Sequence, residues 1–235
     1  MSLNGNKIIC IICARGGSKG LPKKNLRILA GEALIERPIK HALQSKYIDD
    51  VIITTDSPEI ADLAEKAGAK VPFIRPDNLA EDLTTTEATL QHALLTYEKK
   101  VGFKFDICVF LTATDIFRNA DWIDEAIMKL DSNQDLESVF VGYKTHKNFW
   151  EQQEDGSWKR LRNWMSIYSS RQVRRNIVRE DTGLACASRA FLWREGRRIG
   201  DRVEVILTDD DFTSIDIHHE DDLMLAEAAI AIRKK

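Results

Sequence analysis

Apolar and polar positions divide the chain into blocks that predict strands and helices in turn. Residues 8–14 form an apolar run without alternation, which is typical of a strand buried on both faces of a parallel sheet. Further strands are predicted at 51–56, 71–74, 105–111, 138–143, 184–188 and 203–207. Helical spacing of apolar residues predicts helices at 32–46, 58–67, 87–99, 121–130 and 220–235. This alternation predicts βαβ units, and so a Rossmann-like α/β domain with a mostly parallel sheet over residues 1–235.

The pattern changes between residues 144 and 180. There Trp150, Trp158, Trp164 and Tyr168 are interleaved with polar residues and arginines, which predicts short antiparallel strands and loops. Exposed aromatic residues beside arginines are favoured at subunit interfaces, so we expect this insertion to form a homodimer. Aromatic and basic residues also occur together in RNA-binding surfaces, but the rest of the chain is acidic.

Composition and charge narrow the class of protein. The 235 residues are 43% hydrophobic and 30% charged, as in ordinary globular domains. The net charge of −3 argues against a general nucleic-acid binder, so an anion site must be a local basic pocket. No run approaches the roughly 18 apolar residues of a membrane span and no signal peptide is visible, so we expect a cytoplasmic protein.

The four cysteines lie in apolar runs and are expected to be buried, reduced thiols. Cys10 and Cys13 have C-x-x-C spacing. Residues three apart on one strand point to opposite faces, however, so neither a metal site nor a redox pair is expected.

The first predicted strand runs into the most informative loop, residues 15–25. This loop carries three glycines, one serine and four cations. Glycines let backbone N–H groups approach an anion closely, and the cations neutralise its charge. A basic glycine loop at the carboxyl end of a buried strand predicts a phosphate site in an open α/β sheet. Its spacing differs from both the P-loop and the dinucleotide fingerprint.

Three segments resemble the sugar-acid cytidylyltransferases, the family of the CMP-N-acylneuraminate synthetases. Residues 15–25 are similar to the family's Arg-x-x-Ser-Lys-Gly-Leu-Pro-x-Lys-Asn signature, residues 75–82 to its Arg-Pro-x-x-Leu-Ala-x-Asp, and residues 214–222 to its Asp-Ile-Asp-x-x-x-Asp. The resemblance implies a nucleotide-diphospho-sugar transferase fold with an insertion (144–180) that reaches a dimer partner. It also implies transfer of CMP from CTP to a nonulosonic (sialic-like) acid or another small anionic acceptor, with release of pyrophosphate.

The resemblance also implies roles for individual residues. Arg15, Lys24 and Asp216 would be catalytic, with Lys24 near the α-phosphate. The nucleotide-binding set would be Arg15, Gly16, Gly17, Ser18, Lys19, Gly20, Lys24, Asn25, Arg75, Thr84 and Thr86. Within it, the residues of the basic loop would hold the triphosphate, Asn25 would lie near the ribose or base, and the later residues would help to read the pyrimidine.

By the same resemblance, Asp216 would bind Mg²⁺ or Mn²⁺. His218 stands where the family has a second aspartate, and Mg²⁺ prefers oxygen ligands whereas imidazole suits softer ions. Three interpretations remain open: Asp216 suffices together with phosphates and waters, Asp115 replaces the missing ligand, or catalysis is impaired. His218 itself is either a ligand or a residue without a catalytic role. Impaired catalysis would make the chain a nucleotide-binding paralogue with weak or no transferase activity.

The acceptor side departs most from the family. Residues 111–118 correspond to the family's Leu-Gln-Pro-Thr-Ser-Pro-Leu-Arg, and Thr112 replaces the glutamine that contacts the sugar acid. The resemblance assigns Thr112, Thr114, Arg171, Gln172 and Arg179 to the acceptor, with the guanidinium groups facing its anionic end. These departures favour a changed acceptor over a loss of nucleotide binding.

Overall fold

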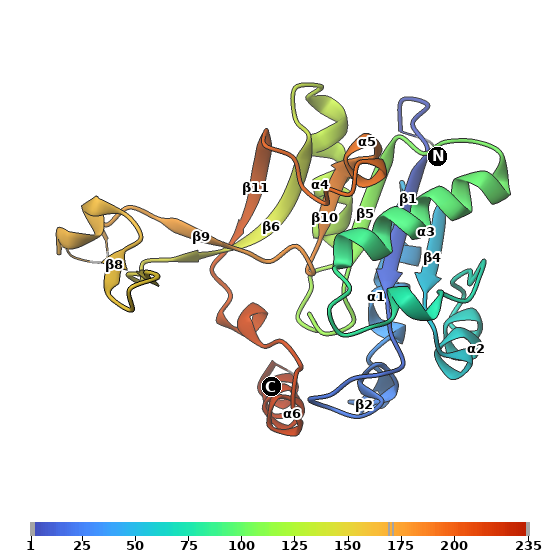
Figure 1. Ribbon diagram of the computed structural model, residues 1–235, viewed down its shortest axis with the longest axis horizontal. Coiled ribbons are helices and arrows are strands. Elements are labelled where there is room, and N and C mark those ends of the chain that lie inside the picture. Colours follow the sequence, from blue (N-terminus) through green and yellow to red (C-terminus); the bar gives the residue numbers. More distant parts are fainter. Residues whose placement is uncertain (1–2, 169, 171, 234–235) are drawn as a thin grey trace.

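A central β-sheet organises the molecule (Figure 1). The computed structural model describes residues 3–168, 170 and 172–233. Within them, seven strands form the sheet: β1 (Ile8–Cys13), β4 (Asp50–Thr54), β5 (Ile107–Leu111), β6 (Ser138–Thr145), β9 (Ile177–Glu180), β10 (Cys186–Arg189) and β11 (Val203–Thr208). The strand order is β11-β6-β10-β5-β1-β4, and β9 pairs with β6. The predicted Rossmann-like, mostly parallel sheet is confirmed.

Helices cover both faces of the sheet: α1 (Glu36–Gln44), α2 (Pro58–Lys66), α3 (Thr86–Val101), α4 (Asp121–Ser132), α5 (Ala190–Arg194) and α6 (Glu220–Arg233). The apolar side chains of α1, α2, α4 and α6 share one buried cluster, and those of α3 and α5 share another. Cys10 belongs to the first cluster and Cys13 packs against the second, which confirms that they point to opposite faces. All four cysteines are free thiols.

Local sequence signals explain where several elements begin and end. The hydroxyl of Ser57 caps α2 by accepting a hydrogen bond from the Ile60 N–H, and Gly68 follows the helix with φ +98°. The helix predicted to start at residue 32 begins at Glu36 instead, because residues 28–33 form the small hairpin of β2 (Ile28–Leu29) and β3 (Glu32–Ala33).

One expectation about the sheet was wrong. Residues 71–74 form no strand and leave only isolated bridges at Lys70 and Ile74, since Pro72 lacks the N–H group that a ladder needs. The alternation of strands and helices also gave no sign that β10 is antiparallel, paired between β5 and β6.

The described residues between β6 and β9 (146–168, 170 and 172–176) form an arm that extends away from the body of the molecule (Figure 1). The arm carries the antiparallel hairpin of β7 (Trp150–Gln152) and β8 (Trp158–Arg160), followed by a short 3-10 helix at Asn163–Ser166. The predicted antiparallel strands are therefore present, and homodimer formation stays a prediction. Across the described residues, no helix has the length and apolar character needed to cross a bilayer.

Candidate active site

The basic loop begins where β1 ends, and hydrogen bonds fix it to the neighbouring elements. The buried Asn25 donates its side-chain amide to the Arg15 carbonyl at 2.9 Å. The Gly16 N–H donates at 2.8 Å to the carboxylate of Asp56, which follows β4. A Cβ at Gly16 would lie 2.9 Å from the Ser57 Cβ, so this close approach requires glycine. The fold thus holds the loop in one position at the carboxyl ends of the parallel strands.

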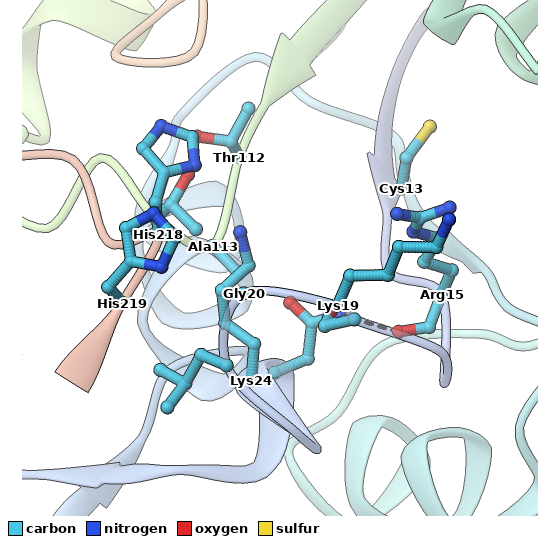
Figure 2. A pocket seen from close by; sticks show the side chains of 13 residues that line it. Cys13, Arg15, Lys19, Gly20, Lys24, Thr112, Ala113, His218 and His219 are labelled. Carbon is cyan, nitrogen blue, oxygen red and sulfur yellow. Dashed lines mark hydrogen bonds between the residues drawn. The ribbon is translucent and has the colours of Figure 1, made fainter. Parts of the chain in front are cut away.

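A cavity of about 400 Å³ lies against this loop (Figure 2). The sequence-derived site residues that line it are Arg15, Ser18, Lys19, Gly20, Lys24, Asn25, Thr112, Thr114 and His218. It is also lined by Cys13, Leu21, Ala113 and His219, for which the sequence predicted no role in the site. His218 and His219 lie on the opposite side of the cavity from Arg15 and Lys19. The basic loop, the loop after β5 and the segment before α6 thus meet around one space.

A second cavity, of about 270 Å³, shares Arg15 and Cys13 with the first. Arg75, Thr84 and Thr86 line it, so the segment that resembles the family's pyrimidine-reading stretch lies beside the basic loop. Arg75 is buried and donates to the hydroxyl of Thr54 at 3.1 Å and to its carbonyl. Burial lowers the pKa of this guanidinium. Arg75 therefore ties the end of β4 to the wall of the second cavity.

Asp82 pairs with two cations of the basic loop. Its carboxylate lies 2.5 Å from Nζ of Lys19 and 3.1 Å from Nη1 of Arg15. Hydrogen bonds and charge from Lys19 first, and then from Arg15, hold the pKa of Asp82 below its usual value. Asp82 ends the motif at 75–82, which was the sequence signal that could have identified it.

Lys24 points toward the same space from the 3-10 helix at Lys24–Leu26. Its Nζ donates to the Ile217 carbonyl at 3.0 Å, which joins the basic loop to the segment before α6. Burial lowers the pKa of Lys24, and the charge of Asp216 partly opposes this shift. A partly desolvated ammonium group interacts more strongly with a phosphate than one in bulk water.

The candidate metal ligands lie in that segment. Nε2 of His218 is 2.9 Å from Oδ2 of Asp216, and Oδ1 of Asp216 is buried without a hydrogen-bond partner. The described residues contain no group of three or more His, Cys, Asp or Glu side chains arranged to hold a metal. One carboxylate and one imidazole with an unsatisfied oxygen fit a divalent cation that takes its other ligands from phosphates and water.

Asp115 lies beside Asp216, with which it forms an antiparallel bridge. Its carboxylate accepts a hydrogen bond from the Thr112 hydroxyl. Burial raises the pKa of Asp115, the hydrogen bond from Thr112 opposes that shift, and the charge of Asp216 adds to it. In this structure Asp115 therefore fixes the orientation of Thr112 on the acceptor loop.

Gln172 and Arg179 do not line the 400 Å³ cavity. Gln172 lines a third cavity, of about 520 Å³, at the base of the arm, with Lys144, His146 and Arg174 among its neighbours. Arg179 forms two hydrogen bonds with Asp181, at 2.7 and 2.9 Å. Arg171 lies outside the described residues.

Arg118, for which the sequence predicted no role, is buried behind the acceptor loop. Arg118 donates to the carbonyls of Thr112 at 2.8 Å, Gly183 at 2.6 Å and Leu184. It therefore holds the loop after β5 against the chain that enters β10. The signal for this role was present, since Arg118 is one of the three residues of 111–118 that match the family pattern.

Solved structures with this architecture define the class of fold. The chain superposes on CMP:2-keto-3-deoxy-manno-octonic acid synthetase complexed with CTP with a TM-score of 0.69, at 15% identity, covering 97% of this chain and 99% of that one. For 4-diphosphocytidyl-2C-methyl-D-erythritol synthase from Anaerococcus prevotii the TM-score is 0.65 at 16% identity, covering 97% of each chain. The chain shares the fold of these two synthases.

The sequence then places the chain within that class. The cytidylyltransferase family matches residues 9–193, most of the chain, and the protein belongs to this family.

Its relatives include pseudaminic acid cytidylyltransferase of Campylobacter jejuni, 38% identical over 54% of this chain and 55% of the relative. CMP-N,N'-diacetyllegionaminic acid synthase of Legionella pneumophila is 40% identical over 52% of each chain. The chain thus spans about half the length of these relatives. Post-translational flagellin modification protein B of Campylobacter coli is 28% identical over 96% of this chain and 95% of the relative.

Proposed function

We propose that this protein is a CTP-dependent cytidylyltransferase that joins CMP to a nonulosonic acid or another small anionic acceptor. Family membership and the names of the relatives support the reaction class. The observation that carries the proposal is the 400 Å³ cavity, where a basic glycine loop and the acceptor loop face one another. Polyphosphate and acceptor would meet in that space.

The proposed reaction is a direct displacement at the α-phosphorus of CTP. An acceptor hydroxyl oxygen forms a bond to this phosphorus, and the bond from phosphorus to the bridging oxygen of the β-phosphate breaks. Pyrophosphate leaves with the electron pair, and the hydroxyl proton passes to solvent. The protein therefore has to position both substrates in line and stabilise the charge that develops on phosphate.

The residues around the two cavities can divide these tasks. Arg15, Lys19 and the N–H groups of the basic loop would bind the β- and γ-phosphates. Lys24, held near Asp216, would stabilise charge at the α-phosphate. The cytosine and ribose would occupy the 270 Å³ cavity beside Thr84 and Thr86, which leaves the Thr112 side of the larger cavity to the acceptor.

A divalent cation, Mg²⁺ or Mn²⁺, would be held by Asp216 with help from His218. When bound, such an ion neutralises triphosphate charge and polarises a phosphoryl oxygen. Asp216 contributes its carboxylate, one oxygen of which lacks a partner, and Arg15, Lys19 and Lys24 supply positive charge from this chain.

A second candidate is a nucleotide-binding paralogue with little or no transferase activity. The presence of His218 in place of an aspartate, and of Thr112 in place of a glutamine, favours it. Both candidates require CTP to bind, and only the first requires turnover.

The test has two parts, CTP binding and turnover. Calorimetry should show that Arg15→Ala and Lys19→Ala abolish measurable CTP binding. Lys23→Gln is the matched control in the same loop, because the Lys23 amine pairs at 2.8 Å with Glu59 on α2 and should leave CTP affinity unchanged. Undiminished affinity in both alanine variants would contradict the assignment of the loop.

Turnover is measured as pyrophosphate release from CTP with Mg²⁺ or Mn²⁺ across a panel of acidic sugars, with the product identified by mass. A product heavier than the acceptor by one CMP residue supports the transferase. Binding of CTP without product from any acceptor supports the paralogue.

We also propose that the protein is a homodimer through residues 144–180 and that it acts in the cytoplasm. The exposed aromatic side chains of the arm support the dimer, since aromatic residues and arginine are enriched at interfaces. The four free cysteines support a reducing compartment.

A further inference from the structure

We propose that His218 is a metal ligand together with Asp216, and that the site therefore binds a first-row transition ion in preference to Mg²⁺. The inference rests on the proposed function, because the ion is the one that would accompany the triphosphate. It concerns the one position at which the metal-binding segment of this chain departs from the family pattern.

The two donor groups already lie together. Nε2 of His218 is 2.9 Å from Oδ2 of Asp216, close enough for both atoms to bind the same ion. The other oxygen of Asp216 is buried with no hydrogen-bond partner. Leaving a buried carboxylate oxygen unsatisfied is unfavourable, and a cation bound to this carboxylate would compensate it.

The backbone that carries His218 is fixed from three sides. The carboxylate of Asp222 accepts hydrogen bonds from the N–H groups of His218 and His219, both at 2.8 Å. Lys24 donates to the carbonyl of Ile217 at 3.0 Å. A Cβ at Gly20 would come within 2.6 Å of the His218 carbonyl oxygen, so the basic loop packs directly on this segment. The backbone of His218 is therefore fixed where its imidazole lines the cavity that would receive the triphosphate.

The chemistry of these donors sets the preference among cations. Mg²⁺ requires near-ideal octahedral coordination and favours oxygen ligands. Imidazole nitrogen binds first-row transition ions better, with affinity that rises from Mn²⁺ through Co²⁺ to Ni²⁺. A pair of aspartates would hold Mg²⁺ through oxygen alone, whereas Asp216 and His218 offer one oxygen donor group and one nitrogen. We therefore expect Mn²⁺ and Co²⁺ to bind at lower concentrations than Mg²⁺.

Pulsed electron paramagnetic resonance of bound Mn²⁺ tests the ligand directly, since a coordinated imidazole adds nitrogen modulation to the echo. The full-length protein is measured with Mn²⁺ alone and with Mn²⁺ and CTP. Nitrogen modulation in either sample supports the inference if it is lost in His218→Asp and retained in His219→Gln. The second variant is the matched control, because His219 lines the same cavity. No modulation in both samples overturns the inference.

Competition between Mg²⁺ and Mn²⁺ measures selectivity by a separate readout. His218→Asp should shift the Mg²⁺:Mn²⁺ affinity ratio toward Mg²⁺ by about tenfold or more. An unchanged ratio overturns the inference. CTP binding and pyrophosphate release are followed in parallel. Turnover with Mg²⁺ but without nitrogen modulation would support the proposed function and overturn this inference. Nitrogen modulation from Mn²⁺ alone, without CTP binding, would support this inference and contradict the proposed function.

Discussion

Asp82 holds the two basic side chains that would otherwise face an incoming triphosphate. Asp82→Asn removes the negative charge shared by Arg15 and Lys19, so we expect CTP affinity to rise about two- to fivefold, the range of an exposed ion pair. Calorimetry against Asp77→Asn separates this effect from a general loss of negative charge, because Asp77 is exposed in the same segment and lines neither cavity. Weaker CTP binding in Asp82→Asn would contradict this prediction and would mean that the Asp82 carboxylate holds the basic loop in the conformation that binds the nucleotide.

His41 on α1 gives the protein a dependence of stability on acid pH. Burial first, and then the charge of Arg118, lower the pKa of His41 from 6.5 to about 4, and its Nδ1 is buried without a partner. Between these two values the unfolded chain binds a proton that the native state does not, so stability falls as the pH decreases through this window. His41→Gln removes this contribution, and its urea midpoint should fall less than that of the wild type. Urea midpoints that fall equally with decreasing pH in the wild type and in His41→Gln would contradict this role of His41.

At the scale of single residues, the sequence could predict functional residues that lie close together along the chain. The basic loop with Arg15 and Lys19 was recognisable because one short stretch contains both the glycines and the cations. Asp82 pairs with cations that lie more than 60 positions earlier in the chain. Arg118 donates to the carbonyl of Gly183, which lies 65 positions later. Such contacts depend on how the elements pack, which periodicity and spacing do not encode.

At the scale of elements, the fit between the basic loop and the segment before α6 decides whether the site assembles. A Cβ at Gly20 would lie 2.6 Å from the His218 carbonyl oxygen, whereas a Cβ at Gly17 would meet no atom within 4 Å. We expect Gly20→Ala to push the two segments apart and lower the rate of CMP transfer roughly tenfold to a hundredfold. Gly17→Ala is the matched control: alanine keeps the backbone N–H that the nucleotide site would use and meets no other atom, so the variant should retain activity. Equal rates of pyrophosphate release in the two variants would show that this contact is dispensable.

The elements themselves were predictable where local signals agreed. The buried run of β1 and the Ser57 cap of α2 each combine a residue preference with an apolar pattern, and both elements form where expected. The strand expected at 71–74 had the apolar residues but also Pro72, and the missing N–H group outweighed the pattern. The direction of β10 follows from the arm, which returns the chain to the sheet by a route that no local signal specifies.

At the scale of the whole molecule, the arm carries several large apolar side chains that a single chain leaves exposed to water. The exposed apolar side chains on it are Phe149, Trp150, Trp158, Leu161, Ile167, Tyr168 and Val173. Arg160 stacks over the rings of Trp150 and Tyr168, which holds these aromatic side chains in place on the arm. An apolar surface of this kind, already ordered, is what a subunit interface requires.

Replacing one aromatic residue of the arm by an acid tests this assembly. Trp158 is 61% exposed in the single chain, and Trp158→Glu would place a charge in the proposed interface. We expect the dimer to weaken by about 2 kcal/mol or more, roughly thirtyfold in its dissociation constant, measured by sedimentation velocity over a range of concentrations. Met224→Glu on α6 is the control, because Met224 is 64% exposed but lies outside the arm, and it should leave the dimer intact. A monomeric wild type would refute the dimer, and equal association of both variants would assign the interface to another surface.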